Sequence, residues 1–89
     1  MKHKSLTSSQ IRAARALVRW RAQDLARESS IGVATIRRAE LSDSETSMTA
    51  ANDLAVRRAL EMAGVEFIDE NGGGPGVRLS KLSKGQQRK

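Results

Sequence analysis

Two adjacent arginines, Arg37 and Arg38, are the side chains whose type and spacing most clearly suggest a chemical role in this sequence. A guanidinium group is planar and always charged, so it donates two parallel hydrogen bonds to O6 and N7 of guanine or to phosphate oxygens. Without further context, such a pair is usually a solvated part of a helix surface. The choice between these interpretations depends on the elements that carry the arginines.

Residues that could form a catalytic or metal site are few and scattered. His3 is the only histidine, there is no cysteine, and the carboxylates are not spaced to meet a nucleophile or a metal ion. The glycine-rich segment 72–76 lacks the Lys-Ser or Lys-Thr pair and the following helix that a phosphate-binding loop needs. We therefore expect a protein that is not an enzyme and that uses no cofactor.

The charge is distributed unevenly along the 89 residues. The net charge of +6 is made up of +6 in residues 1–40, −5 in residues 41–76 and +5 in residues 77–89. This pattern is expected when one surface meets a polyanion and another surface avoids it. The lack of cysteine and of an apolar run long enough for a signal peptide or a membrane span favours a cytoplasmic protein with no membrane partner.

Hydrophobic periodicity predicts a mainly α-helical domain of about four helices. They are expected at residues 8–19, 22–29, 33–40 and 49–63. Thr7 and Gln10 have the spacing of a capping box at the start of the first helix, and Gly64 suits the end of the fourth. In the third helix, Ile36 and Ala39 form the expected buried side, which directs Arg37 and Arg38 outward.

Other basic side chains are expected to lie outside the buried stripes of the first and fourth helices. They are Arg12, Arg15 and Arg19 in the first helix, and Arg57 and Arg58 in the fourth. The three in the first helix either increase solubility or contact phosphates that flank a binding site. Trp20, beside Leu17 and Leu25, is expected to join the core.

After Gly64 the pattern changes from helix to strand, and residues 65–80 are predicted to form a β-hairpin with strands at 65–69 and 77–79. An isolated hairpin is marginally stable in water, so its apolar face must be covered. This face consists of Val65, Phe67, Val77 and Leu79. We expect it to form the seam of a homodimer, with the fourth helix as the alternative seam. The ends, residues 1–7 and 81–89, are expected to be flexible, the second as a disordered basic tail.

Residues 22–40 have the spacing of two short helices that meet at a steep angle. The small side chain of Ala26 allows close approach, Ile31 fills the corner, and Leu25 and Ile36 close the core. In such a helix-turn-helix unit, the second helix presents its amino-terminal end to the major groove of DNA, while the first crosses the backbone.

These residues and their surroundings resemble the Xre family of Cro-like and phage-repressor-like regulators. The resemblance is carried by residues 11–20, 24–26, 34–38, 40 and 57–79, and it covers about residues 8–80. It implies a lambda-repressor-like helix-turn-helix fold in residues 8–64. It also implies binding to a double-stranded DNA operator, usually as a homodimer and often to repress transcription.

The resemblance also implies which side chains face DNA. They are Gln23, Gly32, Val33, Ala34, Thr35, Arg37 and Arg38. Arg37 and Arg38 are the candidates for reading bases, and Val33 and Ala34 for touching a thymine methyl group. Gln23 and Thr35 are the candidates for phosphate contacts, which position a protein without specifying sequence.

Two positions depart from the pattern of this family, which usually has Gln at the first position of the motif and Gly in its turn. This chain has Ala22 and Ser30 there. The first change removes one possible DNA contact, and the second places a side chain in a strained turn at a cost of about 1 kcal/mol. A rival interpretation is a protein-interaction module, such as an antitoxin or an antagonist of another regulator, with weak or no DNA contact.

Overall fold

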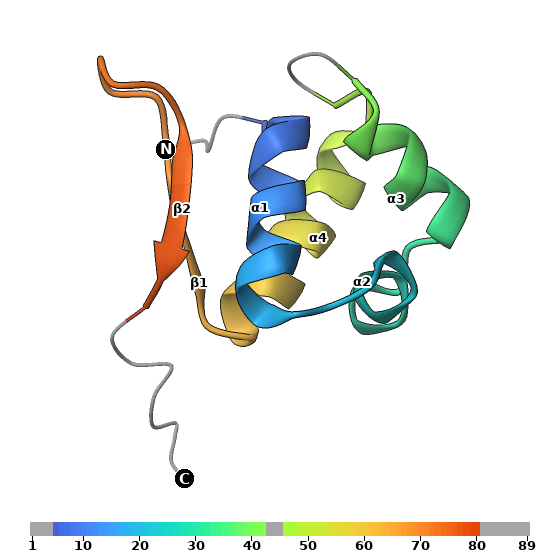
Figure 1. The fold of residues 1–89 in the computed structure, drawn as a ribbon. Helices are drawn as coiled ribbons and strands as arrows, with labels where there is room; N and C mark the ends of the chain where they lie inside the picture. Colours follow the sequence, from blue (N-terminus) through green and yellow to red (C-terminus); the bar gives the residue numbers. More distant parts are fainter. Residues whose placement is uncertain (1–4, 43–45, 81–89) are drawn as a thin grey trace, which may run out of the picture.

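The computed structural model describes residues 5–42 and 46–80, which form four helices followed by a two-stranded antiparallel sheet (Figure 1). The elements are α1 (Ser8–Val18), α2 (Ala22–Ser29), α3 (Val33–Glu40), α4 (Ala50–Met62), β1 (Val65–Ile68) and β2 (Gly76–Leu79). This is the mainly α-helical fold with a carboxyl-terminal hairpin that the sequence predicts. The predicted basic tail and the first four residues of the predicted flexible amino terminus lie outside the described residues.

Local capping interactions explain where the helices begin. At the start of α1, the Thr7 hydroxyl accepts from the backbone N–H of Gln10 at 3.1 Å, and the Gln10 carboxamide oxygen accepts from the backbone N–H of Thr7 at 2.9 Å. The capping box predicted there is therefore confirmed. The carboxylate of Asp24 accepts from the backbone N–H of Arg21 at 2.8 Å before α2, and Thr49 accepts from the N–H of Asn52 before α4. Each interaction satisfies an amide that the helix itself leaves unbonded.

The helices enclose a single core of small and aliphatic side chains. Its fully buried members include Leu6, Ile11, Leu25, Ile36, Val56 and Leu60. Trp20 is half-buried and packs against this core, as predicted. The prediction for Leu6 is wrong, because this residue of the predicted flexible terminus is fully buried and donates its backbone N–H to the Asp53 carboxylate at 2.9 Å.

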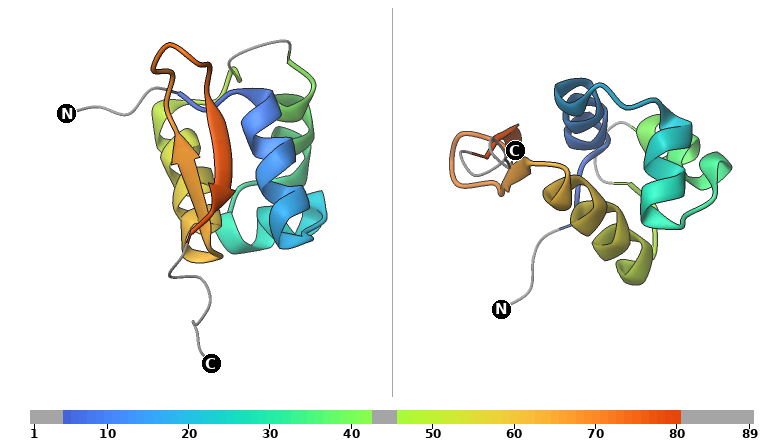
Figure 2. Two further views of the ribbon diagram at one scale, coloured as in Figure 1. Left: turned by 60° about the vertical axis from the view of Figure 1, so that its left-hand side comes forward. Right: turned by 90° about the horizontal axis from the view of Figure 1, so that it is seen from below.

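The hairpin lies against the helices, with β1 beside α4 and β2 beside α1 (Figure 2, left). Its register pairs Val65 with Leu79 and Phe67 with Val77, so these four side chains share one face. The carboxamide of Gln10 in α1 donates to the carbonyls of Ile68 at 3.2 Å and Gly76 at 3.0 Å, at the loop end of the two strands. One side chain therefore joins the first helix to both strands.

Arg57 is buried beneath the hairpin, although helical periodicity placed it outside the core. Its side chain is 4% exposed, and its guanidinium forms ion pairs with Glu61 at 3.8 Å and Asp69 at 3.5 Å. The guanidinium carbon lies 5.1 Å from the centre of the Phe67 ring, a favourable cation–π distance. The prediction is wrong because the hairpin covers a side of α4 that the helix alone would expose.

Candidate nucleic-acid interface

α2 and α3 meet at a tight corner, as the spacing of residues 22–40 predicts. Ser30 ends α2 in the left-handed region, with φ 62° and ψ 28°. The backbone N–H of Ile31 donates to the carbonyl of Ala26 at 3.2 Å, and Ile31 packs against the core inside the corner. The strained conformation expected of Ser30 is confirmed. The chain therefore changes direction between the two helices and does not continue as one long helix (Figure 1).

The outer side of α3 carries the two arginines that the sequence singles out. Ile36 and Ala39 are buried on the inner side, whereas Arg37 and Arg38 are exposed. Within residues 5–42 and 46–80, neither arginine forms an ion pair or a side-chain hydrogen bond with an acidic residue. Their charges therefore remain available to a partner on this side of the molecule.

Of the remaining predicted DNA-facing residues, four lie at the amino-terminal end of α3, and Gln23 lies in the first turn of α2. Gln23, Gly32 and Ala34 are exposed, whereas Val33 and Thr35 are half-buried. Val33 packs partly against the core, which leaves less of its side chain for contact with a base. Gly32 precedes the helix with φ −59°, and a Cβ at this position would meet nothing within 4 Å. The beginning of α3 is therefore open to an approaching surface.

The opposite end of α3 is fastened to α1 by a set of polar contacts. Arg15 donates to both carboxylate oxygens of Glu40, at 2.6 and 2.8 Å, and to the carbonyl of Trp20 at 2.8 Å. Arg12 also donates to the carbonyl of Glu40, and the Ser8 hydroxyl donates to the carbonyl of Ala39. Donors at the last carbonyls of a helix satisfy groups that the helix leaves open. These contacts fix the direction in which α3 points.

The ion pair between Arg15 and Glu40 is largely shielded from water. Side-chain exposure is 22% for Arg15 and 9% for Glu40. Hydrogen bonding to the Glu40 carboxylate raises the pKa of Arg15 above its usual value, against the opposing effect of burial. The prediction that Arg15 is a solubilising or phosphate-contacting group is wrong, because its guanidinium is bound to Glu40. The signal that could have revealed the pair is the position of Glu40, whose spacing from Ile36 places it near the buried side of α3.

The helices that neighbour α3 also carry exposed arginines. Arg19 follows α1 and is exposed, and the side chains of Arg21 and Arg27 are 81% and 67% exposed at the two ends of α2. Asp24 lies between Arg21 and Arg27 and forms an ion pair with each. The backbone N–H of Arg21, and secondarily the guanidinium of Arg27, hold the pKa of Asp24 below its usual value. Arg27 also pairs with Glu28 at 3.7 Å, so the two arginines of α2 are balanced by two carboxylates.

The apolar hairpin face predicted as a dimer seam is mostly covered within the chain. Val65 is buried, and Phe67 and Val77 pack against the core. Leu79 differs, because it is 52% exposed at the end of β2. The hairpin seam remains a prediction, but Leu79 is the one of these four residues that has substantial apolar surface left for a second chain.

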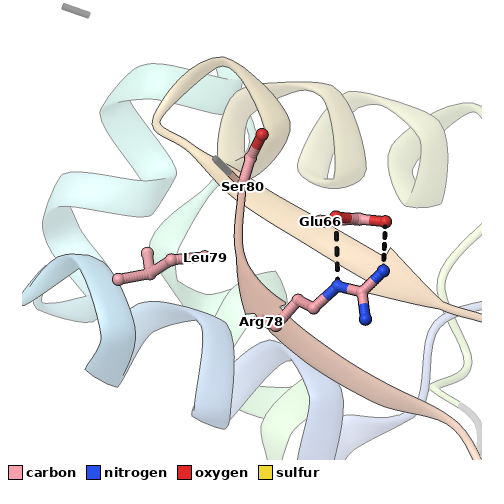
Figure 3. A pocket seen from close by; sticks show the side chains of 4 residues that line it. All are labelled: Glu66, Arg78, Leu79 and Ser80. Carbon is pink, nitrogen blue, oxygen red and sulfur yellow. Dashed lines mark hydrogen bonds and ion pairs between the residues drawn. The ribbon is translucent and has the colours of Figure 1, made fainter. Parts of the chain in front are cut away.

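A shallow hollow on the hairpin is lined by Glu66, Arg78, Leu79 and Ser80 (Figure 3). Arg78 donates to the two carboxylate oxygens of Glu66 at 3.1 and 2.9 Å, which lowers the pKa of Glu66 and raises that of Arg78. The charges in this hollow therefore compensate each other. Among the described residues, no group of three or more His, Asp or Glu side chains is placed to hold a metal ion.

No protein-family model matches the chain, and the search of curated proteins finds no similar sequence. In the part of the chain that the structure describes, no helix has both the length and the apolar character needed to cross a bilayer.

Proposed function

We propose that this protein is a sequence-specific DNA-binding regulator of transcription that acts as a repressor. Its α3 helix enters the major groove, where Arg37 and Arg38 reach base edges or phosphates. It binds as a homodimer in the cytoplasm, so its operator is an inverted repeat with half-sites about 10 base pairs apart, or a multiple of that distance.

The observation that carries this proposal is the pair of exposed arginines on a helix whose other contacts hold it in place. Ile36 and Ala39 anchor the inner side of α3, and Arg15 holds its carboxyl-terminal end through Glu40. A helix that is positioned in this way presents its charges in a defined direction, which sequence-specific recognition requires and a solubilising surface does not. The resemblance of residues 8–80 to the Xre family supports the same function.

The proposal is tested by selecting preferred duplexes from a random pool and comparing them with random DNA at several salt concentrations. We expect affinity to fall steeply with salt, because Lys and Arg contacts release counterions from phosphates. The preferred site is expected to bind about a thousandfold more tightly than random duplex. Salt-dependent binding without a preferred site would instead indicate a nonspecific DNA-binding protein. Absence of binding at physiological salt would favour a protein-interaction module.

Changing Leu79 to aspartate is expected to dissociate the homodimer in sedimentation velocity, because it places a charge at the exposed end of the apolar hairpin face. Operator affinity should then fall roughly a hundredfold, since the second half-site is no longer linked to the first. Met62→Asp is the matched variant for the alternative seam at α4, because Met62 is 90% exposed at the end of this helix. If Met62→Asp dissociates the dimer and Leu79→Asp does not, the seam lies at α4 and the hairpin assignment is wrong.

A further inference from the structure

The tip of the hairpin contains an exposed Asn71-Gly72 sequence. The side chains of Asn71 and of the preceding Glu70 both bond to backbone N–H groups of the glycines that follow. The Asn71 side-chain oxygen accepts a hydrogen bond from the backbone N–H of Gly73 at 3.3 Å. The carboxylate of Glu70 accepts from the backbone N–H groups of Gly72 and Gly74, each at 3.2 Å. The carboxamide of Asn71 is therefore turned along the chain, toward the peptide that follows it.

We propose that Asn71 is a site of spontaneous covalent modification, in which its side chain loses ammonia through a cyclic imide with Gly72. The backbone nitrogen of Gly72 gives up its proton and attacks Cγ of Asn71, and the side-chain amide leaves as ammonia. Water then opens the five-membered imide at either carbonyl. The product is aspartate or isoaspartate, and the net change is replacement of NH₂ by OH, with water as the only other reactant.

Three features of the loop favour this reaction. Gly72 has no side chain to shield its nitrogen, and the N–H of this nitrogen donates to the exposed carboxylate of Glu70 at 3.2 Å, which can take up the proton that the attack releases. Its φ of +101° is a conformation that side chains disfavour and glycine accepts. The N–H of Gly73 is bonded to the oxygen on which negative charge develops during attack, and a donor in that position stabilises such an intermediate.

The second asparagine of the chain provides an internal control. Asn52 lies in the first turn of α4, and the nitrogen that would attack it belongs to Asp53. This N–H donates to the carbonyl of Thr49 at 2.9 Å, and Asp53 is itself buried with its carboxylate bonded to Leu6. The helix therefore holds that nitrogen away from the Asn52 side chain.

Modification would change the charge of the hairpin tip and leave the DNA-facing side unaltered. A new carboxylate at position 71 would join those of Asp69 and Glu70, and Asp69 is the residue that pairs with the buried Arg57. The hairpin and α3 lie at opposite sides of the molecule (Figure 2, right). The added charge therefore acts on the hairpin and its packing on α4.

The test is to incubate the purified full chain at mildly alkaline pH and follow the mass of each asparagine-containing peptide. We expect the peptide with Asn71 to gain the mass of the NH₂ to OH replacement at least about tenfold faster than the peptide with Asn52. It should separate chromatographically into aspartate and isoaspartate forms. Asn71→Gln should abolish the change, because attack would need a larger ring.

Gly73→Ala is the matched control for the loop. Its Cβ would lie 3.8 Å from the Asn71 oxygen, an ordinary contact, and the backbone N–H that polarises the carboxamide remains. This variant should therefore react at a rate similar to that of the parent. A parallel incubation in urea separates the effect of the fold from that of the sequence. Retention of the Asn71 amide in the folded chain, with loss in urea, would overturn the proposal, as would equal rates at Asn71 and Asn52.

Discussion

Replacing Arg15 by alanine is expected to lower the free energy of unfolding by about 2–3 kcal/mol, measured by urea denaturation. The variant leaves the carboxylate of Glu40 with 9% exposure and without its bidentate partner. The carbonyl of Trp20 also loses a donor. Removing one member of a shielded pair costs more than the pair contributes, because the remaining charge is poorly hydrated.

Arg58→Ala is the control for a general effect of removing an arginine. Arg58 is exposed on α4, so its replacement should change stability by no more than about 0.5 kcal/mol. Combining Arg15→Ala with Glu40→Gln removes both charges and should recover about 1 kcal/mol or more of the loss. An Arg15 variant as stable as the Arg58 variant would show that the pair does not hold α3 against α1.

The helices and the hairpin were predictable because their ends are determined by neighbouring residues. The capping box of Thr7 and Gln10 placed the start of α1, and both predicted faces of α3 agree with the observed burial of Ile36 and exposure of Arg37. The corner between α2 and α3 followed from a short interruption at Ser30. Each of these signals lies within a few residues of the feature that it determines.

The contacts that position the candidate site could not be predicted in the same way, because they join residues far apart in the chain. Arg15 and Glu40 are 25 residues apart, and Gln10 bonds to Ile68 across 58 residues. Helical periodicity assigned Arg57 to the surface, since the periodicity of α4 contains no information about the hairpin that covers it. Single-helix patterns therefore separated apolar from polar faces but did not identify which polar side chains bind each other.

Replacing Arg37 or Arg38 by alanine is expected to weaken binding to the preferred operator by about 1–3 kcal/mol, or roughly fivefold to 150-fold in Kd. Both side chains are exposed, so the free energy of unfolding should change by no more than about 0.5 kcal/mol. The lower affinity would therefore reflect lost DNA contacts and not a less stable fold. Arg78→Ala removes the same charge from the hairpin, where the arginine is paired with Glu66, and should bind like the parent.

The two possible roles of these arginines are separated by how the loss depends on DNA sequence and salt. If the replaced arginine reads a base, the variant should bind the preferred site more weakly and show a relaxed base preference at one position of each half-site. If the replaced arginine contacts a phosphate, the variant should bind all sequences more weakly by the same factor. The salt dependence of its affinity should correspond to about one phosphate contact fewer. If both single variants and the double variant bind the operator as tightly as the parent, α3 is not the element that reads DNA. Arg37 and Arg38 would then be a solvated part of the α3 surface, since neither has an acidic partner among the described residues.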